Sequence, residues 1–501
     1  MADRLDAWIH GGTLTRTSLA RYRVLYAVVV LLLLPDFSWI AAFPDSMYNP
    51  PPGPMMLFSG FPSEAVLRAL EAALAVCLVA ILLGWHTRAA SFLSVAVSMI
   101  GYGFTYCLGK IDHDILVVLV PAALALAGWG DRLSLDAVRR RSLGETDRPE
   151  RAVQWPLRLW ALMIGLAFFT AALPKIAGGW LNPLTHAVQG ISIRQFYTHD
   201  RADLLADTFQ GINNPVFWEL MDIATILLEA GILLAVLSWG GTRVAFAIAT
   251  LFHLGVWLMM NIPFWHNVVT YGFVVAWDRV PVPQGLRRSF SPAPGLVRAA
   301  PAMVVAAGIA WSVVIESFGN AAGVMYPVVL VAGALVASGY LALLGVRAVR
   351  SLRKGVEEAS GRLIYDADCG FCTRSARWLA GRHADRIRII AWQAIPDLAA
   401  LGLREDDVNN QAYWQGESGT LKAGSEAIAA AMVARGGPAV AVGRLIASRA
   451  VAPVAASVYR WVAAHRHQMP GSTDACRLPA PSGPAKARPP TRGTAPDSHR
   501  S

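Results

Sequence analysis

Two cysteines separated by two residues, Cys369 and Cys372, are the residues best suited to chemistry in this sequence. They follow the apolar stretch RLIYD and precede a helical pattern over residues 373–381. A helix N-terminus presents free N–H groups and the positive end of the helix dipole, and both stabilise a thiolate. The spacing therefore predicts that Cys369 attacks a disulfide and that Cys372, one turn further, resolves the mixed disulfide.

Neighbouring charges and two alternative interpretations bear on this pair. Asp366 and Asp368 disfavour a nearby thiolate through their negative charge, whereas Arg374 and Arg377 partly offset them. A C-x-x-C pair can also be half of a zinc site, but no second pair completes one, and Cys476 is single. Two buried cysteines without chemistry are the other alternative. The order strand, C-x-x-C, helix, strand favours redox chemistry over both.

Ionisable residues inside or beside apolar segments form a second group of candidates, because charges in a bilayer are costly. These are Lys175 close to Trp180, His113 next to Asp112 and Asp114, the carboxylates Asp222 and Glu229, and His253. Asp222 and Glu229 lie seven residues apart and are expected on one helix face. Carboxylates in such a position can serve proton movement.

Purely structural roles compete with chemistry for these residues. A lysine at the end of a membrane helix can extend to the lipid headgroups, which would account for Lys175. His253 can form a hydrogen bond between helices, and Glu229 can pair with a buried histidine such as His253. Four residues of a long outer loop could bind a metal ion, although a solvated loop is the favoured interpretation; they are His186, His199, Asp200 and Asp203.

The composition indicates a membrane protein. Of the 501 residues, 55% are hydrophobic and 16% are charged, where soluble domains usually carry about 25% charge. The net charge is +10, but most arginines flank apolar segments, which argues against a nucleic-acid groove. Five cysteines with one close pair do not form a disulfide framework. The first apolar run lacks a clear cleavage site and is expected to be a retained anchor.

We expect about ten membrane-spanning helices, since each span needs about 20 mostly apolar residues. The eighth candidate is short. The candidate segments are 22–42, 64–84, 89–108, 114–130, 156–174, 217–238, 244–262, 266–280, 299–318 and 325–346. Residues 1–355 are therefore predicted to form a multi-pass, all-α transmembrane domain.

The basic residues between these segments predict the orientation, because they concentrate in cytoplasmic loops. One set of alternate segments holds Arg4, Arg16, Arg21, Arg23, Arg88, Arg132, Arg139, Arg140, Arg141, Arg148, Arg151, Arg243, Arg279, Arg287, Arg288, Arg298, Arg347, Arg350, Arg353 and Lys354. The other set holds little beyond Arg68, Lys110, Lys175, Arg194 and Arg201. Both chain ends and the C-x-x-C domain are thus predicted on the cytoplasmic side of the cell inner membrane, with Lys175 and His113 at its outer face.

After Lys354 the pattern becomes that of a folded α/β domain, expected over residues 360–476. RLIYD and RIRIIAW predict strands, QAYWQGESGTLK predicts a hairpin, and GSEAIAAAMVARG predicts a helix. Residues 477–501 are rich in proline, glycine and basic residues and are expected to be disordered.

The stretch YDADCGFC, followed much later by GSEAI and YRWVAAHRH…C, resembles the DCC family of thioredoxin-like thiol-disulfide oxidoreductases. The family motif corresponds to Asp368, Cys369 and Cys372. The resemblance implies a thioredoxin-like fold and exchange with the thiol or disulfide of a protein partner. One departure is that no proline precedes QAYW, where thioredoxins place a cis-proline against the active cysteines.

Five short motifs over residues 1–280 resemble the HTTM family, which is related to vitamin K-dependent gamma-carboxylase; they are LLGWHTR, the His113 motif, KIAGGW, LLEAG and TRVAFAIATLFHL. By this resemblance Lys175 corresponds to the catalytic base and His113 to its assisting histidine, and a reduced quinone is the implied cofactor. Pro174 stands where the carboxylase has a second lysine. The resemblance does not extend to a large extracytoplasmic domain that would hold a propeptide.

These features predict an integral membrane protein with two separate sites. One is an outward-opening chamber for a lipophilic substrate such as a quinone, and the other is a cytoplasmic thiol module. Because the cytoplasm is reducing, the cysteine pair would rest as a dithiol. The competing class is a non-enzymatic membrane scaffold or a proton-coupled transporter with a redox-sensing thiol module. The lipid bilayer is the expected partner, and nucleic acid is not.

Overall fold

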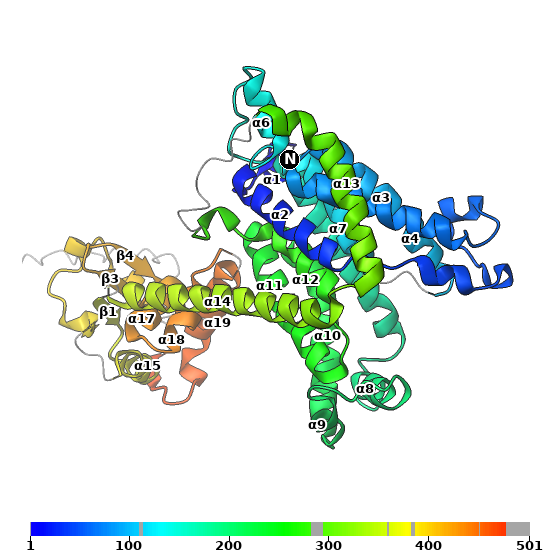
Figure 1. Ribbon diagram of the computed structural model, residues 1–501. Coiled ribbons are helices and arrows are strands. Elements are labelled where there is room, and N and C mark those ends of the chain that lie inside the picture. Colours follow the sequence, from blue (N-terminus) through cyan, green and yellow to red (C-terminus); the bar gives the residue numbers. More distant parts are fainter. Residues whose placement is uncertain are drawn as a thin grey trace, which may run out of the picture. The chain divides into compact units, whose positions relative to one another are not determined.

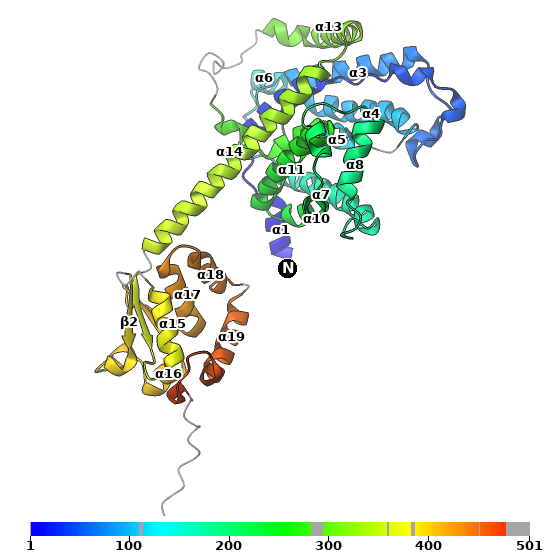
Figure 2. The same ribbon diagram turned by 90° about the horizontal axis from the view of Figure 1, so that it is seen from below.

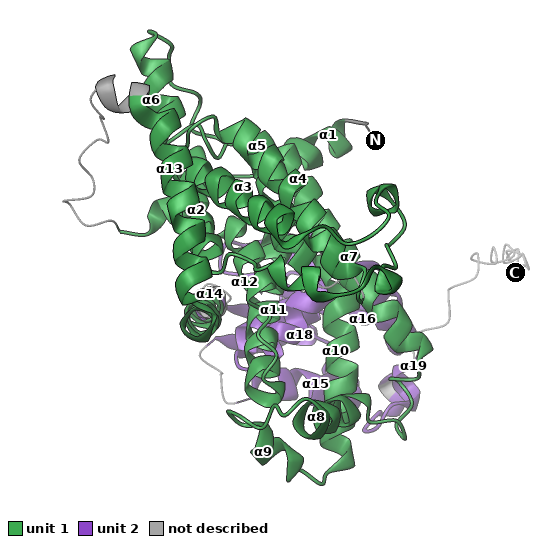
Figure 3. Cartoon of the chain, turned by 45° about the vertical axis from the view of Figure 1, so that its right-hand side comes forward, with its two compact units in different colours: residues 1–342 green, residues 343–501 purple. Residues whose placement is uncertain are grey.

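The computed structural model describes residues 2–109, 114–281, 294–357, 360–381, 386–449 and 451–476. The chain divides into two compact units, residues 1–342 (unit 1) and 343–501 (unit 2), which are green and purple in Figure 3. Helix α14 (Ala322–Glu357) contributes residues to both units, so this division falls earlier than the expected boundary between 355 and 360. The tail expected to be disordered, 477–501, and His113 lie outside the described residues.

Unit 1 is built from helices, as the all-α prediction requires. Helix α3 packs against both α4 and α13 (Figure 1). Gly308 lets α13 approach α3 closely, because a Cβ there would lie 2.5 Å from the Cα of Val76. The helices before α14 are α1 (Ala2–His10), α2 (Arg16–Leu32), α3 (Glu64–Leu83), α4 (Thr87–Tyr106), α5 (Asp114–Ala127), α6 (Leu135–Ser142), α7 (Gln154–Ala177), α8 (Ala187–Thr198), α9 (Ala206–Gln210), α10 (Pro215–Ala235), α11 (Trp239–Met260), α12 (Trp265–Tyr271) and α13 (Pro294–Phe318).

Six helices within the described residues are long and apolar enough to cross a membrane. They are α3, α4, α7 and α11, together with Ala299–Phe318 of α13 and Ala322–Arg350 of α14. Four expected spans are shorter or more polar than predicted, among them 114–130, where α5 has 14 residues. The segments 22–42 and 266–280 overlap the 17-residue α2 and the 7-residue α12, and 217–238 overlaps α10, which carries three carboxylates. The apolar helices nevertheless identify a membrane protein.

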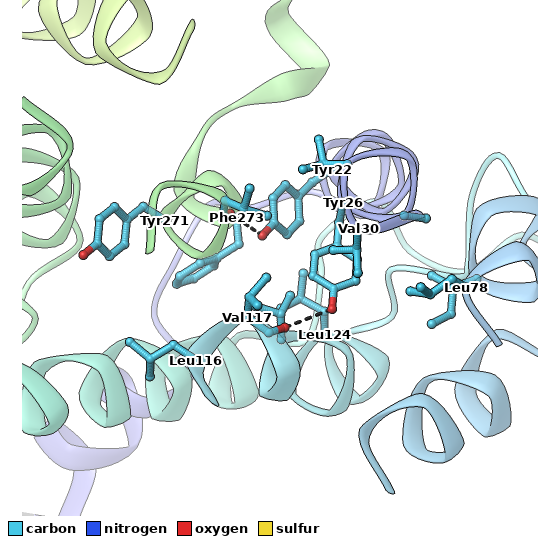
Figure 4. Packing of buried hydrophobic residues seen from close by; sticks show 14 of the residues in the cluster. Tyr22, Tyr26, Val30, Leu78, Leu116, Val117, Leu124, Tyr271 and Phe273 are labelled. Carbon is cyan, nitrogen blue, oxygen red and sulfur yellow. Dashed lines mark hydrogen bonds between the residues drawn. The ribbon is translucent and has the colours of Figure 1, made fainter. Parts of the chain in front are cut away.

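Two buried tyrosines of α2 fix this helix to its neighbours in the core of unit 1 (Figure 4). Tyr22 Oη donates to the carbonyl of Val269 on α12 at 2.6 Å. Tyr26 Oη donates to the carbonyl of Val117 on α5 at 2.9 Å. A buried hydroxyl needs an acceptor, so each bond favours one placement of α2 against these helices.

Basic residues gather at one end of unit 1. Arg16 Nε and Arg140 Nη2 both contact the carboxylate of Asp131, at 2.7 and 3.4 Å. Arg16 also donates to the carbonyl of Arg151 at 2.7 Å, just before α7 begins. Helix α7 has 24 residues, and Lys175 lies near its opposite end, about 30 Å further along the helix axis. The basic cluster and Lys175 are thus separated by nearly the full length of α7.

The described part of unit 2 holds a four-stranded mixed sheet in the order β2-β1-β3-β4. Strands β1 and β2 are parallel and are joined by α15, whereas β3 is antiparallel to both β1 and β4. This topology is the expected thioredoxin-like fold. The elements are β1 (Gly361–Tyr365), α15 (Gly370–Ala380), β2 (Ile387–Ala391), α16 (Glu405–Asn410), β3 (Tyr413–Gly416), β4 (Leu421–Ala423), α17 (Gly424–Arg435), α18 (Ala439–Ile446) and α19 (Ala452–His465).

Side chains of β1 alternate between two apolar layers, as the pleat of a strand requires. Leu363 belongs to a buried cluster with Leu379 of α15 and Ala431 of α17, and Figure 2 shows these helices beside the sheet. Ile364 belongs to a second cluster, which includes Val408 of α16. Because both faces of β1 are packed, the strand is fixed in place. The loop at its carboxyl end, which leads into α15, is fixed with it.

Candidate functional site

The C-x-x-C pair lies where the sequence predicts it, at the start of the helix that follows β1. Cys369 has extended backbone angles and is the N-cap residue of α15, and its carbonyl accepts from Thr373 N at 3.0 Å. Cys372 lies in the first turn. Cys369 is fully buried, whereas the side chain of Cys372 is partly exposed.

The disulfide partner of Cys369 differs from the expected one. Cys369 is bonded to Cys476, which is 107 residues further along the chain, with their Cα atoms 4.5 Å apart. Cys476 belongs to the short 3₁₀ helix η10 (Asp474–Cys476) and is also fully buried. Cys372 is a free thiol. The sequence predicts Cys372 as the partner of Cys369 in exchange and does not identify Cys476 as a disulfide partner.

Arg466 is the cation that contacts the free thiol, in place of the expected Arg374 and Arg377. Its Nη1 lies 3.7 Å from Cys372 Sγ and 3.7 Å from Asp366 Oδ2. Both Arg466 and Asp366 are buried, with side-chain exposures of 7% and 6%. Sequence analysis did not identify Arg466, because nothing in the local pattern shows that it returns to the start of α15.

The loop between β1 and α15 is held by Gln393, a second residue that the sequence did not reveal. Gln393 Nε2 donates to Asp366 Oδ1 at 2.8 Å and to Asp368 Oδ2 at 3.1 Å. Its Oε1 accepts from the backbone N–H of Ala367 at 3.2 Å. Asp366 and Asp368 are therefore tied together, and their supporting role is to fix the loop that carries Cys369.

An apolar cavity of about 880 Å³ opens beside the free thiol. Cys372, Arg466 and Asp366 contribute to its wall. Most of the remaining wall comes from large apolar side chains of α15, α17 and α19, among them Phe371, Trp378, Ile428, Met432, Val458 and Tyr459. A cavity of this size and lining suits a ligand with an apolar body.

The position before β3 differs from the thioredoxin pattern in a way that the structure explains. Ala412 precedes β3, and its backbone N–H donates to Tyr459 Oη at 2.9 Å. Proline has no N–H and could not form this bond. Tyr459 also lines the cavity, so this bond connects the cavity wall to the sheet.

The titration of Cys372 gives a testable prediction. Burial raises the pKa of the Cys372 thiol, the charge of Asp366 raises it further, and the guanidinium of Arg466 opposes both. Only the thiolate is alkylated, so the midpoint of the iodoacetamide rate against pH should lie above the value of about 8.5 for an exposed cysteine.

Because the folded state then binds this proton more tightly, the stability that the thiol contributes is present below about pH 8.5 and is lost as pH rises through the folded pKa. Peptide mapping of the alkylated full chain separates Cys372 from the other thiols, and a midpoint at or below 8.5 would contradict the prediction.

In unit 1, Lys175 and Glu229 form an ion pair between α7 and α10. Lys175 Nζ lies 2.7 Å from Glu229 Oε1 and 2.6 Å from Oε2, and it also donates to the carbonyl of Ala171 at 3.3 Å. The ring of Trp180 lies 5.6 Å from Nζ, within the range of a cation–π contact. The side chains of Lys175 and Glu229 are 24% and 10% exposed. The expected base, Lys175, and two of the expected supporting residues, Glu229 and Trp180, are thus brought together here.

The structure gives Glu229 the amine of Lys175 as its partner, where the sequence suggested a buried histidine such as His253. His253 Nε2 lies 3.0 Å from Tyr271 Oη and 3.3 Å from Asn267 Nδ2, both on α12. These contacts join α11 to α12 and agree with the structural role that the sequence allowed for this histidine. Glu229 is drawn instead to the cationic amine of Lys175, which forms the stronger, charge-assisted bond.

Asp222 has a structural role at the start of α8. Its two carboxylate oxygens each accept a backbone N–H, from Ala187 and Val188, both at 2.7 Å. These N–H groups belong to the first turn of α8 and have no partner within the helix. Asp222 is fully buried, so one carboxylate of α10 caps and orients a neighbouring helix.

Replacing Asp222 with alanine should therefore destabilise unit 1 by about 1–3 kcal/mol, because two buried N–H groups lose their acceptor. Hydrogen exchange of the Ala187 and Val188 amides, followed by mass spectrometry, should accelerate in the variant. Asp222→Asn keeps one acceptor oxygen and serves as the matched control with a smaller effect. Unchanged exchange at both amides in Asp222→Ala would refute the capping role.

Two site predictions remain, namely the assisting histidine and the possible metal site. His113, the expected assisting histidine, lies outside the described residues. Among the residues that the structure does describe, no group of three or more histidine, cysteine or acidic side chains is arranged to hold a metal ion.

Comparisons with known proteins agree with the two units. A model of the HTTM domain matches residues 13–275, which is more than half of the chain. A model of the DCC1-like thiol-disulfide oxidoreductase matches residues 363–472. Searches of curated proteins and of solved structures found no match. The chain therefore belongs to the HTTM family and carries a DCC1-like thiol-disulfide oxidoreductase domain after its membrane helices.

Proposed function

We propose that unit 2 exchanges disulfides with an apolar substrate through Cys372 and Cys369. The observation that carries this proposal is the free thiol of Cys372 in the wall of the apolar cavity, beside the guanidinium of Arg466. The cation partly offsets the effect of burial on the Cys372 thiol, and the start of α15 acts in the same direction, so both favour the thiolate that attacks. This proposal reverses the roles expected from the sequence, and the burial of Cys369 and the position of Cys372 in the cavity wall support the reversal.

The exchange has two steps. The Cys372 thiolate attacks one sulfur of a substrate disulfide R–S–S–R′, which forms a Cys372–S–S–R bond and releases R′ as a thiolate. The thiolate of reduced Cys369 then attacks the Cys372 sulfur, which forms a Cys369–Cys372 disulfide and releases R as a thiolate. The substrate disulfide is reduced and the cysteine pair is oxidised, and the two thiolates released take up protons from solvent.

An assay on the full chain in detergent tests this function. Reduced protein is mixed with a fluorescent peptide that is quenched through an intramolecular disulfide, with glutathione as the electron donor. We expect reduction of the peptide to exceed the rate with glutathione alone, and prior alkylation of the reduced protein to remove the excess. A rate equal to that of glutathione alone would rule out the proposed function.

We propose further that the redox unit lies on the cytoplasmic side of the inner membrane. Support comes from the basic cluster around Asp131 at one end of α7 and the position of Lys175 near the other end, since arginines favour cytoplasmic segments. An impermeant maleimide should label Cys372 in inside-out vesicles and leave it unlabelled in intact spheroplasts. Labelling in intact spheroplasts would reverse this orientation.

For unit 1 we propose a separate role in proton transfer with a lipophilic substrate such as a reduced quinone. It rests on the direct contact of Lys175 Nζ with both oxygens of Glu229, beside the ring of Trp180. A bound reduced quinone would supply an acidic hydroxyl group. Lys175 can accept a proton only after its own has moved to Glu229, so the amine and the carboxylate would act together. The sequence resemblance to gamma-carboxylase, in which Lys175 corresponds to the base, supports this proposal.

The competing proposal for unit 1 is a proton-coupled transporter, and Asp222 supports it less than the sequence suggested because both its oxygens cap α8. Membranes that hold the full chain should consume oxygen when a short-chain hydroquinone is added. Lys175→Ala should abolish this activity, whereas Arg194→Ala should retain it. Full activity in Lys175→Ala would remove the catalytic role, and proton-dependent uptake of a solute without quinone turnover would favour the transporter.

A further inference from the structure

We infer that Cys476 is a third redox-active cysteine, which takes the disulfide over from Cys372 and returns Cys372 to its free thiol form. This inference rests on the proposed exchange function, in which Cys476 has no role. It concerns a residue just beyond the segment that matches the DCC1-like model, residues 363–472.

The first observation is the pairing itself. Cys369 and Cys372 lie in the same first turn of α15, yet Cys369 is bonded to Cys476 and Cys372 is free. The sulfur of Cys369 therefore has two neighbouring cysteines available as partners. The pair Cys369–Cys476 is fully buried, whereas a Cys369–Cys372 disulfide would have one sulfur in the cavity wall. The two pairings differ in whether a substrate can reach the disulfide.

The second observation is that the side chain of Arg466 contacts both cysteines that can pair with Cys369. Arg466 Nη1 contacts Cys372 Sγ at 3.7 Å, while its Nε donates to the carbonyl of Cys476 at 3.0 Å. The ion pair with buried Asp366 holds the guanidinium in this position. Arg466 thereby keeps η10 next to α15 and stabilises negative charge on Cys372, which is the leaving sulfur when Cys476 takes over the disulfide.

The third observation is the position of Thr473, whose backbone N–H donates to the sulfur of Cys476. Thr473 N donates to Cys476 Sγ at 3.3 Å, and Thr473 Oγ1 lies 3.5 Å from the same sulfur. The same hydroxyl accepts from Gly370 N at 3.1 Å and donates its proton to the carbonyl of Asp368 at 2.9 Å. A donor at a sulfur favours its thiolate, which is the attacking form. Thr473 therefore both activates Cys476 and fixes it against the loop that carries Cys369.

The glycine within the C-x-x-C motif allows this arrangement. A Cβ on Gly370 would lie 2.5 Å from the carbonyl oxygen of Gly471. Any other residue at position 370 would push away the segment that carries Thr473 and Cys476. The residue between the two motif cysteines is thus matched to the approach of the third cysteine.

The transfer step is an isomerisation and needs no further oxidant. The thiolate of Cys476 attacks the Cys369 sulfur of the Cys369–Cys372 disulfide, a Cys369–Cys476 bond forms, and the Cys369–Cys372 bond breaks. The electron pair leaves on Cys372, which takes up the proton that Cys476 gave up. The cavity then holds a free thiol again, and a thiolate in the cavity reaches the Cys369–Cys476 disulfide only after the disulfide has been passed back to Cys372.

Disulfide mapping of the full chain in detergent tests this transfer. Reduced protein is oxidised with one equivalent of oxidised glutathione, samples are quenched with acid at successive times, and free thiols are labelled with N-ethylmaleimide before mass spectrometry. We expect a Cys369–Cys372 disulfide to appear first and to be replaced by Cys369–Cys476, with the label on Cys372 at the end. A stable Cys369–Cys372 disulfide with the label on Cys476 would overturn the inference.

Two variants separate this inference from the proposed function. In Cys372→Ser, formation of the Cys369–Cys476 disulfide should slow by more than about tenfold, because the entry thiol is lost. In Cys476→Ser, the Cys369–Cys372 disulfide should accumulate, while Cys107→Ser should behave as the parent. If the Cys369–Cys476 disulfide formed equally fast in Cys372→Ser and in the parent, Cys476 would not receive the disulfide from Cys372. A parent protein that glutathione disulfide does not oxidise at any of the three cysteines would instead refute the exchange function itself.

Discussion

Replacing Cys369 with serine is expected to abolish disulfide exchange by the full chain. Cys369 belongs to the disulfide of the described state, and it is also the resolving sulfur in the proposed reaction. Without it, Cys372 can still form a mixed disulfide with a substrate, but the substrate then stays attached. The quenched-peptide assay should therefore show no catalytic turnover, and mass spectrometry should show a persistent adduct on Cys372.

Cys107→Ser is the matched control for this result. Cys107 is the residue that follows α4 in unit 1. Its thiol is buried and free, and it has no role in the proposed exchange. Its replacement should leave the rate unchanged. Retained turnover in Cys369→Ser, or an equal loss in both variants, would mean that the activity does not arise from the pair at the start of α15.

Replacing Glu229 with alanine is expected to destabilise unit 1 by about 3 kcal/mol, because Lys175 would keep a largely buried amine without its counter-ion. Lys175→Met should cost a similar amount, since Glu229 would then lose its partner. The double variant Lys175→Met/Glu229→Met should recover much of the loss, because no unpaired charge remains. Thermal unfolding in detergent, measured for all four proteins, gives the coupling between the two residues.

The pair Arg68–Glu316 offers a control in the same unit. The contact distance is similar, 2.7 Å, but the side chains are 35% and 47% exposed. Glu316→Ala should therefore lower the stability clearly less than Glu229→Ala, because solvent screens an exposed pair. A double variant at Lys175 and Glu229 that is as unstable as the sum of the single variants would show that the two residues do not form a coupled pair.

Local pattern was sufficient to predict the architecture of unit 2 and the placement of its cysteine motif. The apolar run before Asp366 and the helical pattern after Cys372 led to β1 and α15 with small errors in their ends. Hydrophobic length likewise indicated most membrane helices. It failed at α12, where an apolar stretch holds a helix of only seven residues, because segment hydropathy does not specify backbone conformation.

The partners within the sites could not be predicted, because they depend on contacts between distant parts of the chain. Cys476 lies 107 residues from Cys369, and Glu229 lies 54 residues from Lys175. The sequence placed Glu229 and His253 on apolar helices but gave no information on which neighbour each one faces. The cysteine that ends the motif YRWVAAHRH…C is the one signal in the sequence for a third cysteine. The motif alone does not show that this cysteine forms a disulfide with Cys369.

Thiol trapping in intact cells that produce the full chain tests the central claim most directly, namely that unit 2 of this membrane protein undergoes reversible disulfide exchange. Cells are quenched with acid before, during and after a short pulse of diamide, and the alkylation of Cys369 is measured. We predict that Cys369 is free at rest, becomes protected from alkylation during the pulse, and becomes free again as the cells recover. A Cys369 that stays equally free, or equally protected, at all three times would contradict the account.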